Sequence, residues 1–487
     1  MIDRRQFLKS TLAASAAISL PNIWLRARQA SALEVCEQGV NLVLIQLDGG
    51  NDGLNMVVPF TDGTGQNRSV YQAARPYIAV PQSELGLTQI GNDPLHNGQL
   101  ALHPHMDALK GLYSSGNLAV VLSVQYNNPS LSHDVSKSIW YRADPPLTGA
   151  GSGWIGRTLD SLCTSQPLAV PAVDANSQLS PLFYGNTSVL AFGSIGSLNF
   201  PTSHFLSSAE RTEYKGHFTN IYSAALNNGP NFLAPLGSAG YAAASKIDDY
   251  KTISQAQSLH LNDLIGGTTS GGGQFAVPGV RQSYSLANQL RMIFGLMRGK
   301  QPGNVPLGCR IFRASIGGFD SHGNQGNHVP LTTKTLAQKV TEGFQGEYHG
   351  QLMHRLDKAI GAFWQDLVDQ NMHGNTVLMT FTEFGRRIDE NGTHDTDSGT
   401  DHGTASPMFV IGPTAAQSTA AAHLGGGIHS AHAELDHPNN DGNMVYQLDF
   451  RHVYGDILNK WLGVPLSTTN SFLGAGGFTY SPQGILV

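Results

Sequence analysis

The sequence predicts an α/β fold in which a sheet lies buried between helices. Three largely apolar runs, at residues 41–47, 118–124 and 310–316, have the composition of interior strands. Such runs, without polar alternation, are typical of parallel sheets covered on both faces. A later segment has apolar residues at helical spacing, at Leu352, Leu356, Ile360, Phe363 and Leu367. With 487 residues, 40% of them hydrophobic, the chain can form one large domain with insertions or two domains.

The N-terminus predicts an export signal. Residues 3–9 (DRRQFLK) resemble the twin-arginine motif, and an apolar stretch of small residues follows at about 12–20. Residues 30–32 (ASA) suit a cleavage site. We therefore expect a twin-arginine signal peptide at residues 1–32 and a mature chain of 33–487, periplasmic or secreted. A short membrane anchor or an ordinary helix is the alternative.

The charge and cysteine content exclude several classes of protein. Removing residues 1–32 takes away five basic residues and one acid, so the formal net charge of −6 becomes −10. An acidic mature chain is unsuited to nonspecific nucleic-acid binding. The three cysteines, Cys36, Cys163 and Cys309, are too widely spaced for a cysteine zinc cluster. Beyond the N-terminus, no apolar run is long enough to predict a transmembrane segment.

The middle of the chain, from about 150 to 305, has a different composition. It is rich in Gly, Ser and Asn, with short apolar runs at 168–173 and 189–192. One clear helix has apolar residues at helical spacing, at Leu286, Leu290, Ile293 and Met297. We expect this region to supply the edge of the sheet and a helical insertion or cap.

Acidic residues and histidines stand where the predicted strands meet their loops. Turns that follow neighbouring parallel strands converge on one edge of a sheet. Carboxylates brought together there repel one another unless a cation holds them. Carboxylate oxygens mixed with imidazole suit Zn, Mn or Fe, or Ca and Mg where oxygen dominates. The candidate ligands are Asp48, Asp320, His322, Glu383, Asp401 and His402.

Each of these residues also has a purely structural interpretation. Asp48 lies among glycines that suit a tight turn, and Asp320 with His322 could begin a helix. Glu383 could pair with Arg386 or Arg387 at the surface. The pair Asp401 and His402 could hydrogen-bond within its loop, and Ser132 could serve only as a helix N-cap.

Several motifs together resemble a bacterial family exported by the twin-arginine route, the domain of unknown function 1501, which is grouped with the alkaline phosphatase and sulfatase superfamily. The resemblance covers nearly the whole mature chain, in order. It implies an alkaline phosphatase-like, doubly wound sheet with a helical insertion. It also implies a metal centre, usually of two ions, and a hydroxyl nucleophile at a helix N-terminus. The motifs are DGGNDGLN at 48–55, GFDSH at 318–322, TEFGR at 382–386, GTDHGTA at 399–405 and DFR at 449–451.

The resemblance assigns roles to individual metal ligands. Asp48 matches the first-strand aspartate, and His402 matches a late histidine that precedes a strand. Asp320 and His322 match an Asp–His ligand pair with a shorter spacing than usual. Glu383 takes the place of the Asp in a strand-ending Asp–His pair, whose His is replaced by Phe384.

The resemblance also implies catalytic residues. Ser132 best matches the nucleophile, with Ser130 as the competing position, and Arg386 or Arg387 could clamp the developing charge. We therefore expect an exported hydrolase of phosphate or sulfate esters that uses one or two divalent ions on a small-molecule substrate. The alternative is a non-catalytic exported binding or assembly protein that keeps the same fold.

Overall fold

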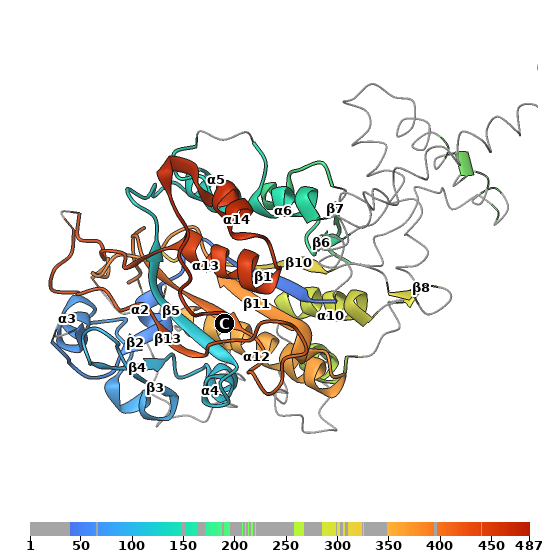
Figure 1. The fold of residues 1–487 in the computed structure, drawn as a ribbon. Coiled ribbons are helices and arrows are strands. Elements are labelled where there is room, and N and C mark those ends of the chain that lie inside the picture. The colour runs from blue at the N-terminus through green and yellow to red at the C-terminus, as the bar shows by residue number, and fades with distance from the viewer. Residues whose placement is uncertain are drawn as a thin grey trace, which may run out of the picture.

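A mixed sheet runs through the centre of the computed structural model (Figure 1). Among the described residues its nine strands follow the order β13-β5-β12-β11-β1-β10-β6-β7, with β14 also paired to β5. Their bounds are β1 (Asn41–Asp48), β5 (Leu118–Gln125), β6 (Ala172–Asp174), β7 (Val189–Ala191), β10 (Ile311–Gly317), β11 (Thr376–Phe381), β12 (Ser406–Ile411), β13 (Gly427–His429) and β14 (Leu448–Asp449).

The structure describes residues 39–487 with gaps, so the expected signal peptide at 1–32 and all three cysteines lie outside the described part. None of the helices within the described part is long and apolar enough to cross a membrane. The gaps are residues 65–66, 148–150, 163–170, 188, 195–200, most of 201–257, 267–284, 299, 302–304, 307–309, 324, 326–347, 394–396 and 440.

The direction of the strands explains why the polar loops meet. β1 pairs in parallel with β10 on one side and with β11 on the other. β12 runs antiparallel between β11 and β5. The N-terminal end of β12 therefore lies at the same sheet edge as the C-terminal ends of β1, β10 and β11. The loop that precedes β12 is brought beside the loops that follow the other three strands.

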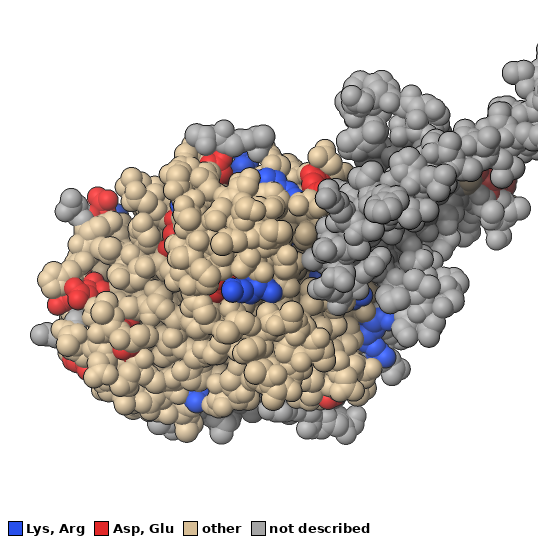
Figure 2. All heavy atoms as spheres, in the orientation of Figure 1, with Lys and Arg blue, Asp and Glu red and all other residues tan. Residues whose placement is uncertain are grey.

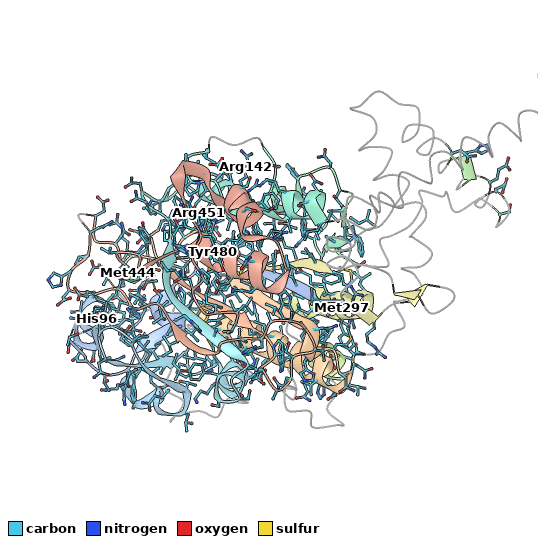
Figure 3. The ribbon with its side chains drawn as sticks, viewed as in Figure 1. His96, Arg142, Met297, Met444, Arg451 and Tyr480 are labelled. Carbon is cyan, nitrogen blue, oxygen red and sulfur yellow. The ribbon has the colours of Figure 1, made fainter. Side chains whose placement is uncertain are left out.

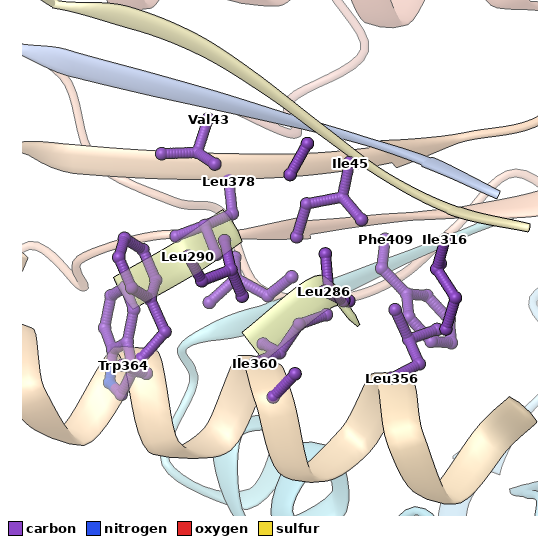
Figure 4. Close-up of a cluster of buried hydrophobic side chains, with 14 of the residues drawn as sticks. Val43, Ile45, Leu286, Leu290, Ile316, Leu356, Ile360, Trp364, Leu378 and Phe409 are labelled. Atoms are coloured by element: carbon purple, nitrogen blue, oxygen red, sulfur yellow. The ribbon is translucent and has the colours of Figure 1, made fainter. Parts of the chain in front are cut away.

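Helices cover both faces of the sheet, which confirms the predicted α/β class. Successive side chains of β1 point to opposite faces, so Val43 and Ile45 enter one core and Leu42 and Leu44 the other. The first core, part of which is shown in Figure 4, is closed by α4 (Asp107–Ser114), α10 (Ser285–Arg298) and α12 (Tyr348–Asp369). The second is closed by α5 (His133–Arg142), α6 (Trp154–Leu162) and α13 (Phe450–Asp456).

The region from 150 to 305 contributes both to the sheet edge and to the core. β6 and β7 extend the sheet beyond β10 in parallel, as expected from their short apolar runs. α10, expected within an insertion or cap, instead packs its apolar face on the first core with Leu286, Leu290 and Ile293 fully buried. Each such side chain stabilises the fold by roughly 1.5–3 kcal/mol on burial.

The C-terminal layer is anchored by a capped helix. The Asp449 carboxylate accepts a hydrogen bond from Arg451 N at 3.0 Å and caps α13. The Arg451 guanidinium returns to Asp449 at 2.7 Å, within the C-terminal layer shown in Figure 3. Asp449 and Arg451, the first and last residues of the DFR motif, therefore stabilise this helix.

On the face shown in Figure 2, Lys and Arg side chains are few and scattered.

Shorter elements complete the described part of the chain. The remaining elements are α2 (Gly53–Met56), β2 (Val57–Pro59), α3 (Asn67–Ala74), η1 (Gln82–Glu84), η2 (Gly86–Thr88), β3 (Gln89–Asn92), β4 (Gln99–Leu102), η3 (Pro181–Phe183), α9 (Leu259–Gly266), β8 (Lys300–Gln301), β9 (Val305–Pro306), η6 (His373–Asn375), η7 (Ile457–Trp461), α14 (Leu466–Leu473) and η8 (Ala475–Gly477).

Candidate metal centre

The loops after β1 and β10 touch each other at the sheet edge. Asp48 at the end of β1 lies opposite Gly317 at the end of β10. Gly49 has a φ of +123°, and a Cβ atom there would lie 2.4 Å from the backbone nitrogen of Asp320. Only glycine allows both this backbone conformation and this approach. Gly49, directly after β1, thus allows the loop after β10 to place Asp320 over the end of β1.

Asp320 is the centre of a cluster of histidines. Its Oδ1 atom lies 3.2 Å from His322 Nε2 and 3.3 Å from His402 Nε2. Its Oδ2 atom lies 3.5 Å from His133 Nε2. Burial alone would raise the pKa of Asp320, but the hydrogen bond and the positive charge of Arg386, together with the neighbouring histidines, outweigh it and hold the pKa at about 2. The carboxylate is therefore ionised at neutral pH.

Two imidazole rings face each other through nitrogen lone pairs. His322 Nε2 and His402 Nε2 are 2.9 Å apart. The Nδ1 atom of His402 lies 2.8 Å from the Leu131 carbonyl oxygen, and that of His322 lies 3.0 Å from Asp401 Oδ1. Carbonyl and carboxylate oxygens can only accept, so each Nδ1 carries a proton. With both rings neutral, each Nε2 presents a lone pair, and two lone pairs at this distance repel unless a cation lies between them.

His133 is the third imidazole of the cluster, and the sequence analysis did not select it. Its Nδ1 atom lies 2.9 Å from Glu383 Oε1, which again leaves the lone pair on Nε2. His133 Nε2 is buried and makes no hydrogen bond. The ligand atoms of His133, Asp320 and His402 all lie within 4.8 Å of one another. The position of His133 at the start of a helix was the only signal in the sequence.

Three of the predicted ligands support the cluster instead of facing it. Glu383 is buried and accepts hydrogen bonds from Gly49 N at 2.9 Å and from the His133 ring. Asp401 holds the His322 ring, whose hydrogen bond, outweighing burial, lowers the pKa of the Asp401 carboxyl. Asp48 lies 2.5 Å from the Lys137 ammonium group. Glu383 and Asp401 orient histidine rings and so fix the tautomer that binds metal, whereas Asp48 pairs with a lysine.

Arg386, which the resemblance suggests as a substrate clamp, is buried among backbone carbonyls. Its side chain is 0% exposed. Nε donates to the Gly50 carbonyl and Nη1 to the Thr400 carbonyl, each at 2.8 Å. Nη2 donates to the Phe319 carbonyl at 3.0 Å and to Asp320 at 2.8 Å. These acceptors come from three loops of the sheet edge, so the guanidinium fastens the loops together and has no donor facing a substrate.

Phe384, which stands where a ligand histidine is expected, forms a wall of the cluster. The ring is fully buried and its centroid lies 4.8 Å from that of His133 and 4.5 Å from that of His402. This apolar contact restricts the orientation of both imidazoles. The site therefore has three histidines despite the replacement, because α5 supplies His133.

Ser132 lies next to this cluster, at the beginning of α5. It is exposed, and its side chain makes no capping hydrogen bond to the helix. The structural interpretation of Ser132 as an N-cap through its hydroxyl is therefore not supported. Ser132 directly precedes His133 in the chain, at the N-terminus of a ten-residue helix, where the helix dipole favours anions.

The donor set fits a divalent transition metal. Three imidazole nitrogens and one carboxylate suit Zn, Mn or Fe better than Ca or Mg, which prefer oxygen ligands. The buried, unbonded Nε2 atom of His133 and the facing lone pairs of His322 and His402 are the observations that a bound ion would account for.

Two family models match the chain. Residues 304–422 match the model described as "Protein of unknown function (DUF1501)", and residues 1–21 match the twin-arginine translocation pathway signal sequence. These matches confirm the predicted resemblance over residues 304–422 and the twin-arginine export route. None of the curated proteins compared with the chain matches it.

Distant solved structures are also similar to the chain. The lipoteichoic acid synthase LtaP from Listeria monocytogenes is 11% identical, with a TM-score of 0.30 over 88% of this chain and 72% of that one. The alkaline phosphatase from the Antarctic bacterium TAB5 is 10% identical, with a TM-score of 0.26 over 77% of this chain and 92% of that one. At these TM-scores neither similarity supports an inference about the chain.

Proposed function

We propose that this exported chain, with a DUF1501 domain at residues 304–422 behind a twin-arginine signal, is a metal-dependent hydrolase of phosphate or sulfate esters. The observation that carries the proposal is the pair of Nε2 atoms of His322 and His402, 2.9 Å apart with both Nδ1 protons directed elsewhere. Asp320 adds an ionised carboxylate within 3.3 Å of both. Such a set of donors without a cation is electrostatically unfavourable.

The residues of the chain have distinct tasks in this proposal. A bound divalent ion supplies Lewis-acid stabilisation of phosphoryl or sulfuryl oxygens and lowers the pKa of a hydroxyl group or water beside it. Ser132 offers the nucleophilic hydroxyl at the N-terminus of α5, where the dipole favours an anionic ester. Phe384 keeps the rings of the cluster in place and excludes water from one side. The ion would be held by His133, Asp320, His322 and His402.

A non-catalytic binding or assembly protein is the second candidate. One observation favours it: the buried Arg386 cannot stabilise charge that develops on a substrate, because all its nitrogens donate to the protein. Metal-assisted hydrolysis would then depend on the ion and the helix N-terminus alone. A protein of this second class would bind the metal and an anionic ligand without turning it over.

Metal content and hydrolysis, measured on protein purified after export, test the proposal. The wild type is expected to contain a transition metal and to hydrolyse p-nitrophenyl phosphate or p-nitrophenyl sulfate. Asp320→Asn should lose metal and activity, and Ser132→Ala should lose activity but keep the metal. His429→Ala is the matched control, because that ring bonds the Gly426 carbonyl away from the cluster. Metal without turnover supports the binding protein, and absence of metal contradicts the hydrolase.

A further inference from the structure

We infer that the Lys137 ammonium group occupies the position that a second cation would otherwise take, so that the candidate centre binds one divalent ion and not two. This inference rests on the metal-binding part of the proposed function. It concerns the carboxylates of Asp48 and Glu383, which the sequence predicts as ligands but which contact Lys137, Glu383 also holding the outer side of the His133 ring. It assigns Lys137 the role of a built-in counter-ion.

The contacts of Lys137 show that both carboxylates already face a positive charge. Its Nζ atom lies 2.5 Å from Asp48 Oδ1 and 3.7 Å from Glu383 Oε1. The lysine side chain is only 25% exposed and that of Glu383 is 0% exposed. An ion pair in such partly buried surroundings is weakly screened by salt. A divalent ion at this place would have to displace the ammonium group or suffer its repulsion.

One face of α5 delivers these groups together. His133 and Lys137 are four residues apart and therefore lie on the same side of the helix. Ser136, between them on this face, donates its hydroxyl to the Glu383 carbonyl oxygen at 2.5 Å. Glu383 thus receives contacts from three residues of a single helix. The helix places an imidazole at the Asp320 cluster and an ammonium group at the Asp48 carboxylate.

Asp48 is held by a second set of contacts that leaves it oriented towards Lys137. Gln46 donates from Nε2 to Asp48 Oδ1 at 3.1 Å. The Oε1 atom of Gln46 accepts hydrogen bonds from the Arg313 guanidinium and from the Tyr141 hydroxyl. The carboxylate is therefore fixed by neighbours on β1, β10 and α5. Its position does not require a metal.

Metal stoichiometry distinguishes one ion from two without an activity assay. Protein stripped with a chelator and titrated with Zn²⁺ or Mn²⁺, with the bound metal measured by mass spectrometry, should bind one ion per chain. Lys137→Arg, which keeps the charge, should also bind one. Lys137→Met removes the charge while keeping the aliphatic stem, and should bind a second ion. Two ions in the wild type, or one in Lys137→Met, would overturn the inference while leaving the hydrolase proposal standing.

A further variant keeps the test decisive if Lys137→Met does not fold. Asp48→Asn should retain the single ion with unchanged affinity, because Asp48 pairs with Lys137 and is not a ligand. Loss of the ion from Asp48→Asn would overturn the inference. A wild type that binds no ion would contradict both this inference and the metal-dependent function. The measured number of ions per chain, zero, separates this outcome from the others.

Discussion

Replacing Arg386 with lysine is expected to lower the free energy of unfolding by about 3–5 kcal/mol. The buried guanidinium donates to four carbonyls and one carboxylate, those of Gly49, Gly50, Thr400, Phe319 and Asp320. A lysine ammonium is a point charge without a planar fork and cannot reach acceptors in three loops at once. The loss of two hydrogen bonds to a charged group, at about 1.5–3 kcal/mol each, gives a change of this size.

Urea unfolding of chelator-treated protein measures this change without the contribution that metal binding would add to stability. Arg387→Lys is the matched control, because the neighbouring arginine is only partly buried, and it should change stability by less than about 0.5 kcal/mol. If Arg386→Lys unfolds at the same urea concentration as the wild type and loses only activity, the scaffold role of Arg386 is refuted and the substrate clamp is restored.

Two further substitutions test other parts of the site's framework. Burial would raise the pKa of Asp52, but the charge of Arg75 outweighs it, so the pKa lies below 3.8. The ionised Asp52 therefore stabilises the folded state fully above pH 3.8, and this stabilisation is lost as the pH falls further. Asp52→Asn should therefore lower the free energy of unfolding by about 3–5 kcal/mol at neutral pH and remove this dependence on acid pH. Urea unfolding between pH 2 and 7 would measure both effects. An equal loss of stability at every pH would contradict the assignment. Gly50→Ala should cost roughly 1–3 kcal/mol more than Gly427→Ala, since both have a φ near +80° but only the Gly50 Cβ meets the Phe384 ring, at 2.4 Å. Equal thermal unfolding of the two alanine variants would contradict the overlap with Phe384.

The sheet and its polar edge could be predicted because both depend on local patterns. The runs that became β1, β5 and β10 are largely apolar, as expected of strands between two helical layers. Polar residues directly after such strands have no other place than the sheet edge. This is why Asp320 and His402, far apart in the sequence, were expected together and lie 3.3 Å apart.

The division of the predicted ligands could not be read from the sequence. Glu383 contacts the Nδ1 side of the His133 ring and not the side that faces Asp320. This arrangement depends on how closely α5 packs against the loop after β11. The packing of α5 likewise brings Lys137 to Asp48. Such distances follow from the packing of the whole second core, not from the identity of neighbouring residues.

Arg386 shows a second limit of sequence reasoning. An arginine in a polar loop beside a catalytic motif is compatible with substrate binding and with loop anchoring alike. Only the tertiary structure shows that the guanidinium is enclosed by the carbonyls of converging loops. The reversed direction of β12 was likewise not predictable from its apolar composition, although it brings His402 to the site.

Anomalous diffraction at the absorption edge of the bound metal would test the central claim most directly. We predict one peak, bonded at about 2.0–2.2 Å to the Nε2 atoms of His322 and His402 and to the Asp320 carboxylate, with His133 Nε2 turned towards it. The absence of a peak at these atoms, or a peak between Asp48 and Glu383 with the histidines unbound, would contradict the proposed centre.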